Sequence, residues 1–250
     1  MFHNIFGWVI DESRAVQLFS FHHYLYVGIG VLAVFLTLQF SAKIYASPHE
    51  AAIRNGVFIF LLALEIIYHL HNWIHGIFSL PLHISSFAVI MSLALLKTNS
   101  QKVFEYVFFF GVLGGSMALL VPFSYGFPYY NIRYHLFLWL HILIVIVPLY
   151  YYKGYGYRVS LRATYKTFFM VFLTIPIIFN LNRFFIAMGL SSPESPINYW
   201  FVTEIPEHVT FVFGDRHTIY LGVFVSAIYV MQMFLYKLTK QSDAEGYADE

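Results

Sequence analysis

Seven long apolar stretches limit what this chain can fold into. Each has roughly the 20 mostly apolar residues that an α-helix needs to cross the hydrocarbon core of a bilayer. We expect these spans at about residues 24–41, 57–74, 80–96, 103–121, 136–152, 167–185 and 218–238. Charged residues make up only 11% of the 250 residues, well below the level of about 25% in soluble domains. The sequence therefore predicts an all-α, polytopic membrane protein with a single membrane domain over residues 1–250.

The lysines and arginines between the spans predict the orientation. The side that carries the N-terminus has four, at Arg14, Arg133, Arg183 and Arg216. The other side has ten, at Lys43, Arg54, Lys97, Lys102, Lys153, Arg158, Arg162, Lys166, Lys237 and Lys240. Because basic loops stay in the cytoplasm, we expect the N-terminus outside and the C-terminus inside the cell. Residues 1–10 lack the pattern of a signal peptide and are expected to form an interfacial helix, and residues 243–250 an acidic, flexible tail.

Several kinds of site are excluded or left without support. The chain has no cysteine, which excludes disulfides and thiolate metal sites. A net charge of +1 without a basic run gives no reason to expect a nucleic-acid partner. The zinc-protease pattern HExxH and a glycine-rich phosphate loop are both missing. Three imidazoles for zinc (His71, His75 and His83) or a haem between His69 and His141 stay open, but nothing selects them. No metal site is predicted, and the cofactor is unknown.

Eleven of the twelve histidines fall on the outer surface or in the outer half of the bilayer under this topology. In the second span, Glu65, His69 and Asn72 follow at i, i+4 and i+7 and therefore share one helix face. A carboxylate one turn from an imidazole fixes its tautomer and raises its basicity. An unpaired carboxylate near mid-membrane is costly, so Glu65 is expected to be a proton relay or a structural partner.

Other polar residues extend this outer group. Pro81 is expected in the first turn of the third span, with His83 projecting from that turn and Ser85 just below. The candidate bases are His83, His141 and His69, and the candidate hydroxyls are Ser85, Ser86 and Ser116. The candidate amides for substrate are Asn72, Asn180 and Asn198, and Arg183 is the candidate anchor for a headgroup. Such a set permits acyl transfer or ester hydrolysis, because it offers a base, a hydroxyl and polarising donors.

Three short motifs carry a resemblance to known proteins. They are Leu80-Pro81-Leu82-His83 followed by Ser85, Leu138-Trp139-Leu140-His141, and Asn198-Tyr199-Trp200-Phe201 followed by Glu204-Ile205-Pro206. The pattern resembles the bacterial YwaF-type integral membrane proteins and, more distantly, an animal seven-span acyltransferase that remodels ether phospholipids. Hydrolases of fatty-acid esters of hydroxy fatty acids are further relatives of this kind. The resemblance implies a seven-helix bundle in the bacterial inner membrane, with a polar pocket that opens to the lipid.

The sequence departs from that pattern at two positions. The animal acyltransferase has a cysteine where this chain has Leu82, and bacterial relatives often have one where this chain has Ser85. A thioester route is therefore excluded. Either Ser85 replaces the thiol as nucleophile or the activity is lost.

Two function classes follow, and a third is weaker. The leading hypothesis is a seven-helix membrane protein whose His/Asn/Arg pocket faces the outer leaflet and binds or processes lipid acyl or ester groups. The alternative is a non-enzymatic membrane subunit whose polar residues hold a cofactor or another membrane chain. A small-solute transporter needs a polar path to the cytoplasm, and the cytoplasmic halves are too apolar for one. The expected partners are membrane lipid and, under the alternative, a second membrane subunit.

Overall fold

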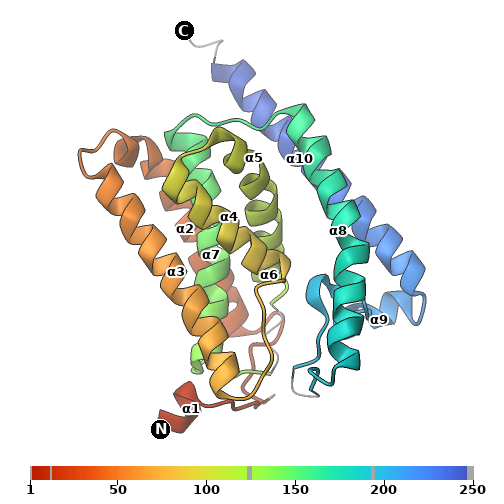
Figure 1. The fold of residues 1–250 in the computed structure, drawn as a ribbon. Helices are drawn as coiled ribbons and strands as arrows, with labels where there is room; N and C mark the ends of the chain where they lie inside the picture. The colour runs from red at the N-terminus through yellow and green to blue at the C-terminus, as the bar shows by residue number, and fades with distance from the viewer. Residues whose placement is uncertain (1, 12, 123–125, 193–194, 247–250) are drawn as a thin grey trace. The chain divides into compact units, whose positions relative to one another are not determined.

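Helices make up 74% of the protein in the computed structural model, and no strand occurs among the described residues (Figure 1). The structure describes residues 2–11, 13–122, 126–192 and 195–246. By their contacts these residues form two compact units. The first unit comprises Met1–Pro81 and Ser85–Tyr157, and the second comprises Leu82–Ile84 and Arg158–Glu250. One membrane domain can hold two such units, so the predicted single domain of residues 1–250 stays a prediction.

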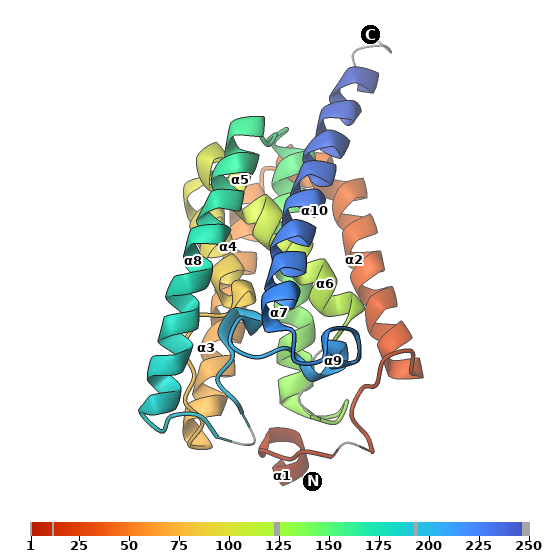
Figure 2. The ribbon, with the colours of Figure 1, turned by 90° about the vertical axis from the view of Figure 1, so that its right-hand side faces the viewer.

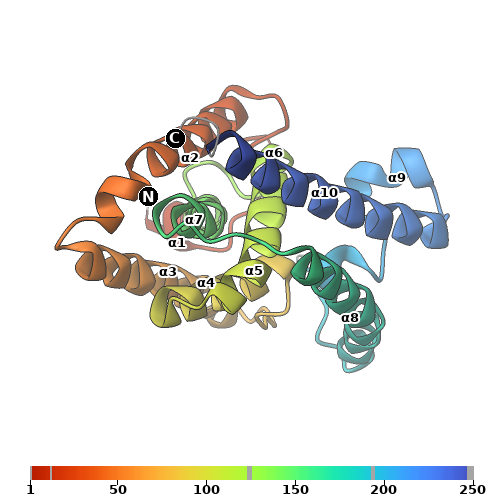
Figure 3. The same ribbon diagram turned by 90° about the horizontal axis from the view of Figure 1, so that it is seen from above.

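Helix α7 is the centre of the first unit. Viewed along its axis, α7 lies inside a ring formed by α2, α3, α4, α5 and α6 (Figure 3). In its most apolar 18 residues 67% are buried, against 17% for α2 and 11% for α3, so most of α7 is enclosed by the other helices of this unit. The helices of this unit are α1 (Phe2–Phe6), α2 (Phe21–Tyr45), α3 (Glu50–Ile74), α4 (Ile84–Thr98), α5 (Gln101–Phe109), the π-helical turn η1 (Phe110–Gly114), α6 (Gly115–Leu120) and α7 (Ile132–Gly154).

Small residues let the stretch from α5 to α6 approach α7 closely. A Cβ atom at Gly115 would lie 2.5 Å from Val145 Cγ2, and one at Gly111 would collide with the Ile144 carbonyl. Gly111 and Gly115 are one helical turn apart and together let the two backbones meet, as small-residue pairs do in membrane helices. The π-helical turn between them adds a residue to that turn and marks the point where the helix adapts to α7.

The second unit is built on two long helices, α8 and α10, which pack against each other (Figure 2). Phe168 of α8 meets Tyr229 of α10 edge to face, with ring centroids 5.0 Å apart. The segment between the two helices carries a short 3-10 turn and a short helix. The elements are α8 (Leu161–Ala187), η2 (Tyr199–Phe201), α9 (Glu207–Phe213) and α10 (His217–Gly246). Because α10 continues to Gly246, the predicted acidic tail of residues 243–250 begins inside a helix, and residues 247–250 lie outside the described part.

Six helical stretches are long and apolar enough to cross a membrane. They are Phe21–Tyr45, Glu50–Ile74, Gln101–Leu120, Ile132–Gly154, Leu161–Ala187 and His217–Lys240. They correspond to six of the seven predicted spans. The number seven and the orientation of the termini stay predictions.

The predicted span at residues 80–96 differs from the structure. Helix α4 begins only at Ile84 and has 15 residues, so it extends about 22 Å, against roughly 30 Å of hydrocarbon. Pro81 and His83 lie in the turn before it, so the prediction that they occupy its first turn was wrong. In a helix that started at Leu80, the Leu82 carbonyl would pair with a backbone N–H one turn later. It accepts the Trp200 indole N–H instead, at 2.7 Å.

Candidate functional site

The first unit contains a hydrogen-bonded series of a carboxylate, an imidazole and a hydroxyl. His69 Nε2 lies 3.2 Å from Glu65 Oε1, and His69 Nδ1 lies 2.8 Å from Ser79 Oγ. All three side chains are buried. The i, i+4 pair that the sequence predicted is therefore present. Ser79, which was not predicted, completes it on the other edge of the ring.

Ser79 reaches His69 because the chain reverses at the end of α3. Gly76 adopts a left-handed conformation (φ +73°), the usual helix stop, and the Ile77 N–H returns to the Asn72 carbonyl at 2.9 Å. The Trp73 indole N–H then donates to the Ser79 carbonyl at 2.9 Å. These bonds hold Ser79 beside the last turns of α3. Its hydroxyl therefore meets His69, ten positions earlier in the chain.

The roles of the three groups follow from their chemistry. When Glu65 is ionised it can only accept a hydrogen bond, and the proton of the imidazole is then on His69 Nε2. The Nδ1 lone pair then accepts the Ser79 O–H. An imidazole held in this arrangement can act as a base toward the hydroxyl, and a neighbouring carboxylate can stabilise the imidazolium that would form.

Two more of the predicted residues lie in the same unit. His141 of α7 is buried, donates its Nδ1–H to the Phe137 carbonyl at 2.7 Å and interacts electrostatically with Glu65. Asn72 is only 2% exposed, and within the described part of the chain its Oδ1 atom has no hydrogen-bond partner. A buried amide oxygen of this kind is available to a donor that a substrate brings.

A second polar group of the first unit surrounds Arg133, which the sequence analysis used only for orientation. This buried guanidinium makes no ion pair with any described residue. It stacks on Tyr68, 4.0 Å from its ring centroid, and lies 5.4 Å and 5.5 Å from the rings of Trp8 and Phe127. Its Nη1 also donates to the Tyr68 carbonyl at 3.2 Å. Three aromatic faces and one carbonyl therefore hold this cation.

The N-terminal segment is fastened beside the Arg133 group. His71 Nε2 donates to the Phe6 carbonyl at 2.9 Å, and Asn131 Nδ2 donates to the carbonyls of Asn4 and Gly7 at 3.1 and 3.0 Å. A helix is present within residues 1–10 in shorter form, as α1, and this segment is attached to the ends of α3 and α7. Its predicted position in the membrane interface stays a prediction.

In the second unit His83 belongs to an aromatic cluster. Its ring centroid lies 4.9 Å from that of Tyr199 and 5.9 Å from that of Phe201. The segment that supplies these rings is organised by Asn182 of α8, which is 0% exposed. Asn182 Nδ2 donates to the Tyr199 carbonyl at 3.0 Å and to Thr203 Oγ1 at 2.7 Å, and its Oδ1 accepts the Tyr199 N–H at 3.2 Å. Sequence reasoning did not select Asn182 for any role.

The backbone of this segment is strained. Trp200 and Phe201 have φ values of +61° and +55°, which cost non-glycine residues roughly 1–2 kcal/mol each. Surrounding bonds hold them there. Asn198 Oδ1 accepts the Thr203 N–H at 3.0 Å, and His217 Nε2 donates to the Val202 carbonyl at 2.9 Å. Strain of this kind concentrates at binding and catalytic sites, so the segment is a candidate for function.

The other predicted residues are less enclosed. Asn180 is exposed and donates to the Pro176 carbonyl of its own helix at 2.7 Å. Arg183 is also exposed, with its guanidinium 5.8 Å from the Phe179 ring. Ser85 lies half-buried in the first turn of α4.

The predicted pocket residues are thus distributed over both units. Glu65, His69, Asn72, Ser85 and His141 belong to the first unit, and His83, Asn180, Arg183 and Asn198 to the second. A single pocket made from all of them stays a prediction. Among the described residues, no group of three or more His, Asp or Glu side chains is arranged to hold a metal ion.

Comparison with known proteins finds one family. The model of the TMEM164 family matches residues 18–237, which is most of the chain. No curated protein matches, and no solved structure does. This match identifies a transmembrane family but tests neither the resemblance to YwaF-type proteins nor an acyltransferase activity.

Proposed function

The chain belongs to the TMEM164 family of transmembrane proteins, and on that premise we propose that it is a multi-pass membrane enzyme that transfers or hydrolyses lipid acyl groups. The observation that carries this proposal is the series Glu65–His69–Ser79, with its distances of 3.2 and 2.8 Å. The arrangement is that of an activated serine nucleophile, because the base is in hydrogen-bond reach of the hydroxyl on one side and of the orienting carboxylate on the other. The resemblance to lipid acyltransferases supports the choice of an acyl ester as substrate.

In the first half of the proposed reaction, Ser79 Oγ attacks the carbonyl carbon of a lipid ester, and its proton moves to His69 Nδ1. The Glu65 carboxylate holds the Nε2–H and stabilises the positive ring. His69 then returns the proton from Nδ1 to the alcohol oxygen as the C–O bond breaks. A lysolipid leaves, and the acyl chain remains as an ester on Ser79.

In the second half an incoming hydroxyl attacks the acyl-Ser79 ester. Its proton passes to His69 Nδ1 and from there to Ser79 Oγ, which restores the starting state. The Oδ1 of Asn72, on the same helix face as His69 and without a partner among the described residues, can accept a hydrogen bond from another donor group of the incoming molecule. Because Ser79 is only 8% exposed, the site favours a lipid hydroxyl over bulk water as the acceptor.

The remaining predicted residues receive roles as part of the same proposal. His141 shields and polarises Glu65 from α7. Asn180 and Arg183 are candidates for contact with the headgroup, since Arg183 exposes a cation at the end of α8. The family resemblance would select a different catalytic centre, made of His83, Ser85 and Asn198. Ser79 with His69 is preferred because their hydrogen bond is present.

The test uses purified protein in nanodiscs that contain phosphatidylcholine and an isotope-labelled lysolipid, with acyl exchange followed by mass spectrometry. Ser79→Ala should lower turnover about 10³-fold or more, the size typical for loss of a serine nucleophile. Ser85→Ala is the matched control and should leave turnover within about twofold. Because the chain has no cysteine, Ser79→Cys introduces the only thiol, so loss of its activity on alkylation reports on this position alone.

Three outcomes would count against the proposal. Turnover that survives Ser79→Ala but not Ser85→Ala would move the centre to Ser85 and His83. If both variants keep their turnover, neither Ser79 nor Ser85 is the nucleophile. No turnover by the wild type, together with a second membrane chain that co-purifies, would favour the non-enzymatic subunit.

A further inference from the structure

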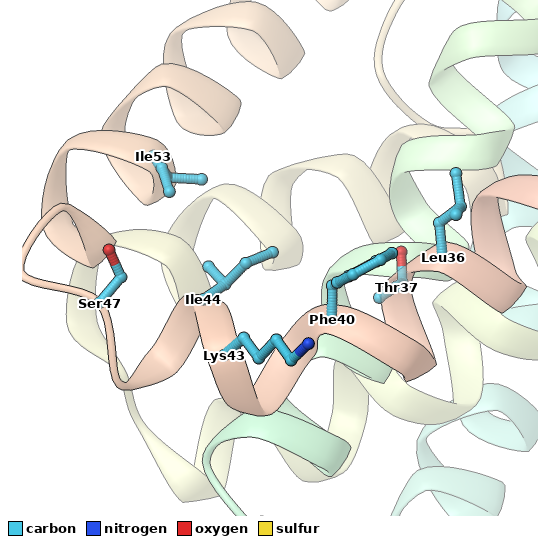
Figure 4. Close-up of a pocket in the computed structure, with 7 residues that line it drawn as sticks. All are labelled: Leu36, Thr37, Phe40, Lys43, Ile44, Ser47 and Ile53. Carbon is cyan, nitrogen blue, oxygen red and sulfur yellow. The ribbon is translucent and has the colours of Figure 1, made fainter.

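The first unit has an open groove beside the last turns of α2, where the chain turns into α3 (Figure 4). Its volume is about 460 Å³, within the range of roughly 300–1,000 Å³ that is usual for sites of small ligands. Leu36 and Phe40 of α2 and Ile53 of α3 form its apolar wall, and all three are more than one-third exposed. The groove is therefore open at the exposed surface of the first unit.

The lining of the groove also includes a positive charge and a hydroxyl. Lys43 extends toward Phe40, with its Nζ atom 5.6 Å from the ring centroid, and Ser47 lies beyond Ile44 where the chain leaves α2 (Figure 4). Among the described residues no acidic side chain pairs with Lys43. The nearby carboxylate, Glu50, is already engaged, since it accepts from Arg54 Nε at 3.0 Å and from two tyrosine hydroxyls.

We propose that this groove binds one anionic phospholipid. An acyl chain lies along Leu36 and Phe40, and the phosphate of the headgroup pairs with Lys43. Ser47 Oγ accepts the His49 N–H at 3.1 Å, so its own O–H remains to donate to a phosphate oxygen. The occupant is a lipid because the lining residues belong to two helices that are long and apolar enough to cross a membrane. It is anionic because, among the described residues that line the groove, the charged side chain is the cation Lys43.

The predicted orientation agrees with this occupant. The loop charges predict that this end of α2 lies in the cytoplasmic leaflet, where anionic lipids gather and a nearby lysine contributes about 1 kcal/mol to their attraction. The groove does not include Glu65, His69 or Ser79, so the proposed lipid site does not depend on the proposed enzymatic activity.

The test measures lipid retention by native mass spectrometry. Full-length protein is released from nanodiscs that contain equal amounts of phosphatidylglycerol and phosphatidylcholine with identical acyl chains. Phosphatidylglycerol should be retained about fivefold more, the ratio that corresponds to about 1 kcal/mol. Lys43→Gln should remove that preference, whereas Lys97→Gln, an exposed lysine with the same charge change at the end of α4, should keep it.

A second pair of variants tests the groove itself. Thr37 lines the groove, and Thr37→Phe should fill it and reduce retention of both lipids. Leu38→Phe, at the next position but outside the lining, should retain lipid as the wild type does. Equal retention of the two lipids by the wild type, or equal loss in Lys43→Gln and Lys97→Gln, would show nonspecific annular lipid only and overturn the proposal. Ser79→Ala should bind the lipid normally, which separates this result from any failure of turnover.

Discussion

Replacing Asn182 by alanine should release the strained segment around Trp200 without unfolding the protein. The side chain is fully buried and makes three hydrogen bonds to that segment, two with backbone atoms of Tyr199 and one with Thr203 Oγ1. Alanine removes all three and provides nothing in their place. The backbone groups of Tyr199 then lack partners unless the segment moves to reach other donors and acceptors.

The size of the effect follows from the bonds that are lost. Each contributes a net of about 0.5–1.5 kcal/mol, so together they supply about 3 kcal/mol. The left-handed conformations of Trp200 and Phe201 cost roughly 1–2 kcal/mol each, and this strain is relieved when the segment opens. Loss of the three bonds should therefore lower the free energy of local opening by about 3 kcal/mol, which is about 10²-fold in the opening equilibrium.

Hydrogen exchange measured by mass spectrometry on peptides that cover residues 198–204 reports this equilibrium. We expect exchange about 10² times faster in Asn182→Ala than in the wild type, with little change in α8 itself. Asn180→Ala is the matched control, because Asn180 is exposed and bonds only to its own helix, and its exchange should stay within about twofold. Equal exchange in the two variants would refute the view that Asn182 holds the segment.

Two further predictions concern the first unit. Gly111→Ala should lower the free energy of unfolding by about 1–3 kcal/mol, because the new methyl group meets the Ile144 carbonyl. Gly28→Ala is the control: its methyl group meets nothing within 4 Å, so it should raise the free energy of unfolding by about 0.5–1 kcal/mol. Reversible unfolding in mixed micelles measures both. Burial and a hydrogen bond to Glu50 raise the pKa of Tyr155 to about 12, so the free energy of unfolding should fall as the pH rises from about 10 to 12. Glu50→Gln should move the pKa of Tyr155 toward its usual value, which NMR of labelled tyrosine measures. An unchanged pKa would contradict the assignment.

The predicted span at residues 80–96 shows where hydropathy ceases to be informative. Its apolar residues are real, but the helix starts only at Ile84. The Trp200 indole takes the Leu82 carbonyl, and Trp200 lies more than a hundred residues further along the chain. A bond between such distant residues leaves no trace in a local window of apolar residues.

The candidate catalytic series divides in the same way. The pairing of Glu65 with His69 follows from helical periodicity, which places residues four apart on one face. Ser79 depends on the reversal at Gly76, a position whose left-handed conformation could have been suspected from a glycine that follows a long apolar helix. Even so, only the folded chain shows that the reversal brings this hydroxyl to the imidazole.

Asn180, Asn182 and Arg183 illustrate a different limit. All three lie near the end of one apolar helix. Asn180 and Arg183 are the two for which the sequence predicts contact with substrate, and both are exposed in the structure. Asn182 points to nearly the opposite side of the helix from Asn180, because two residues turn a helix by roughly 200°. Which side of a membrane helix faces protein is hard to read when nearly every residue around it is apolar.

What the sequence by itself determined is the class of protein, six long apolar helices among its seven predicted spans, and the pairing of Glu65 with His69. These follow from local rules, since a membrane helix satisfies its own backbone hydrogen bonds and its hydropathy can be read residue by residue. The tertiary structure decided which polar side chains meet. Ser79 reaches His69 through the chain reversal at Gly76. The contacts of Asn182 with Tyr199 and of Arg133 with its aromatic neighbours join segments that are distant in sequence. Such contacts depend on packing, which no local pattern of residues encodes.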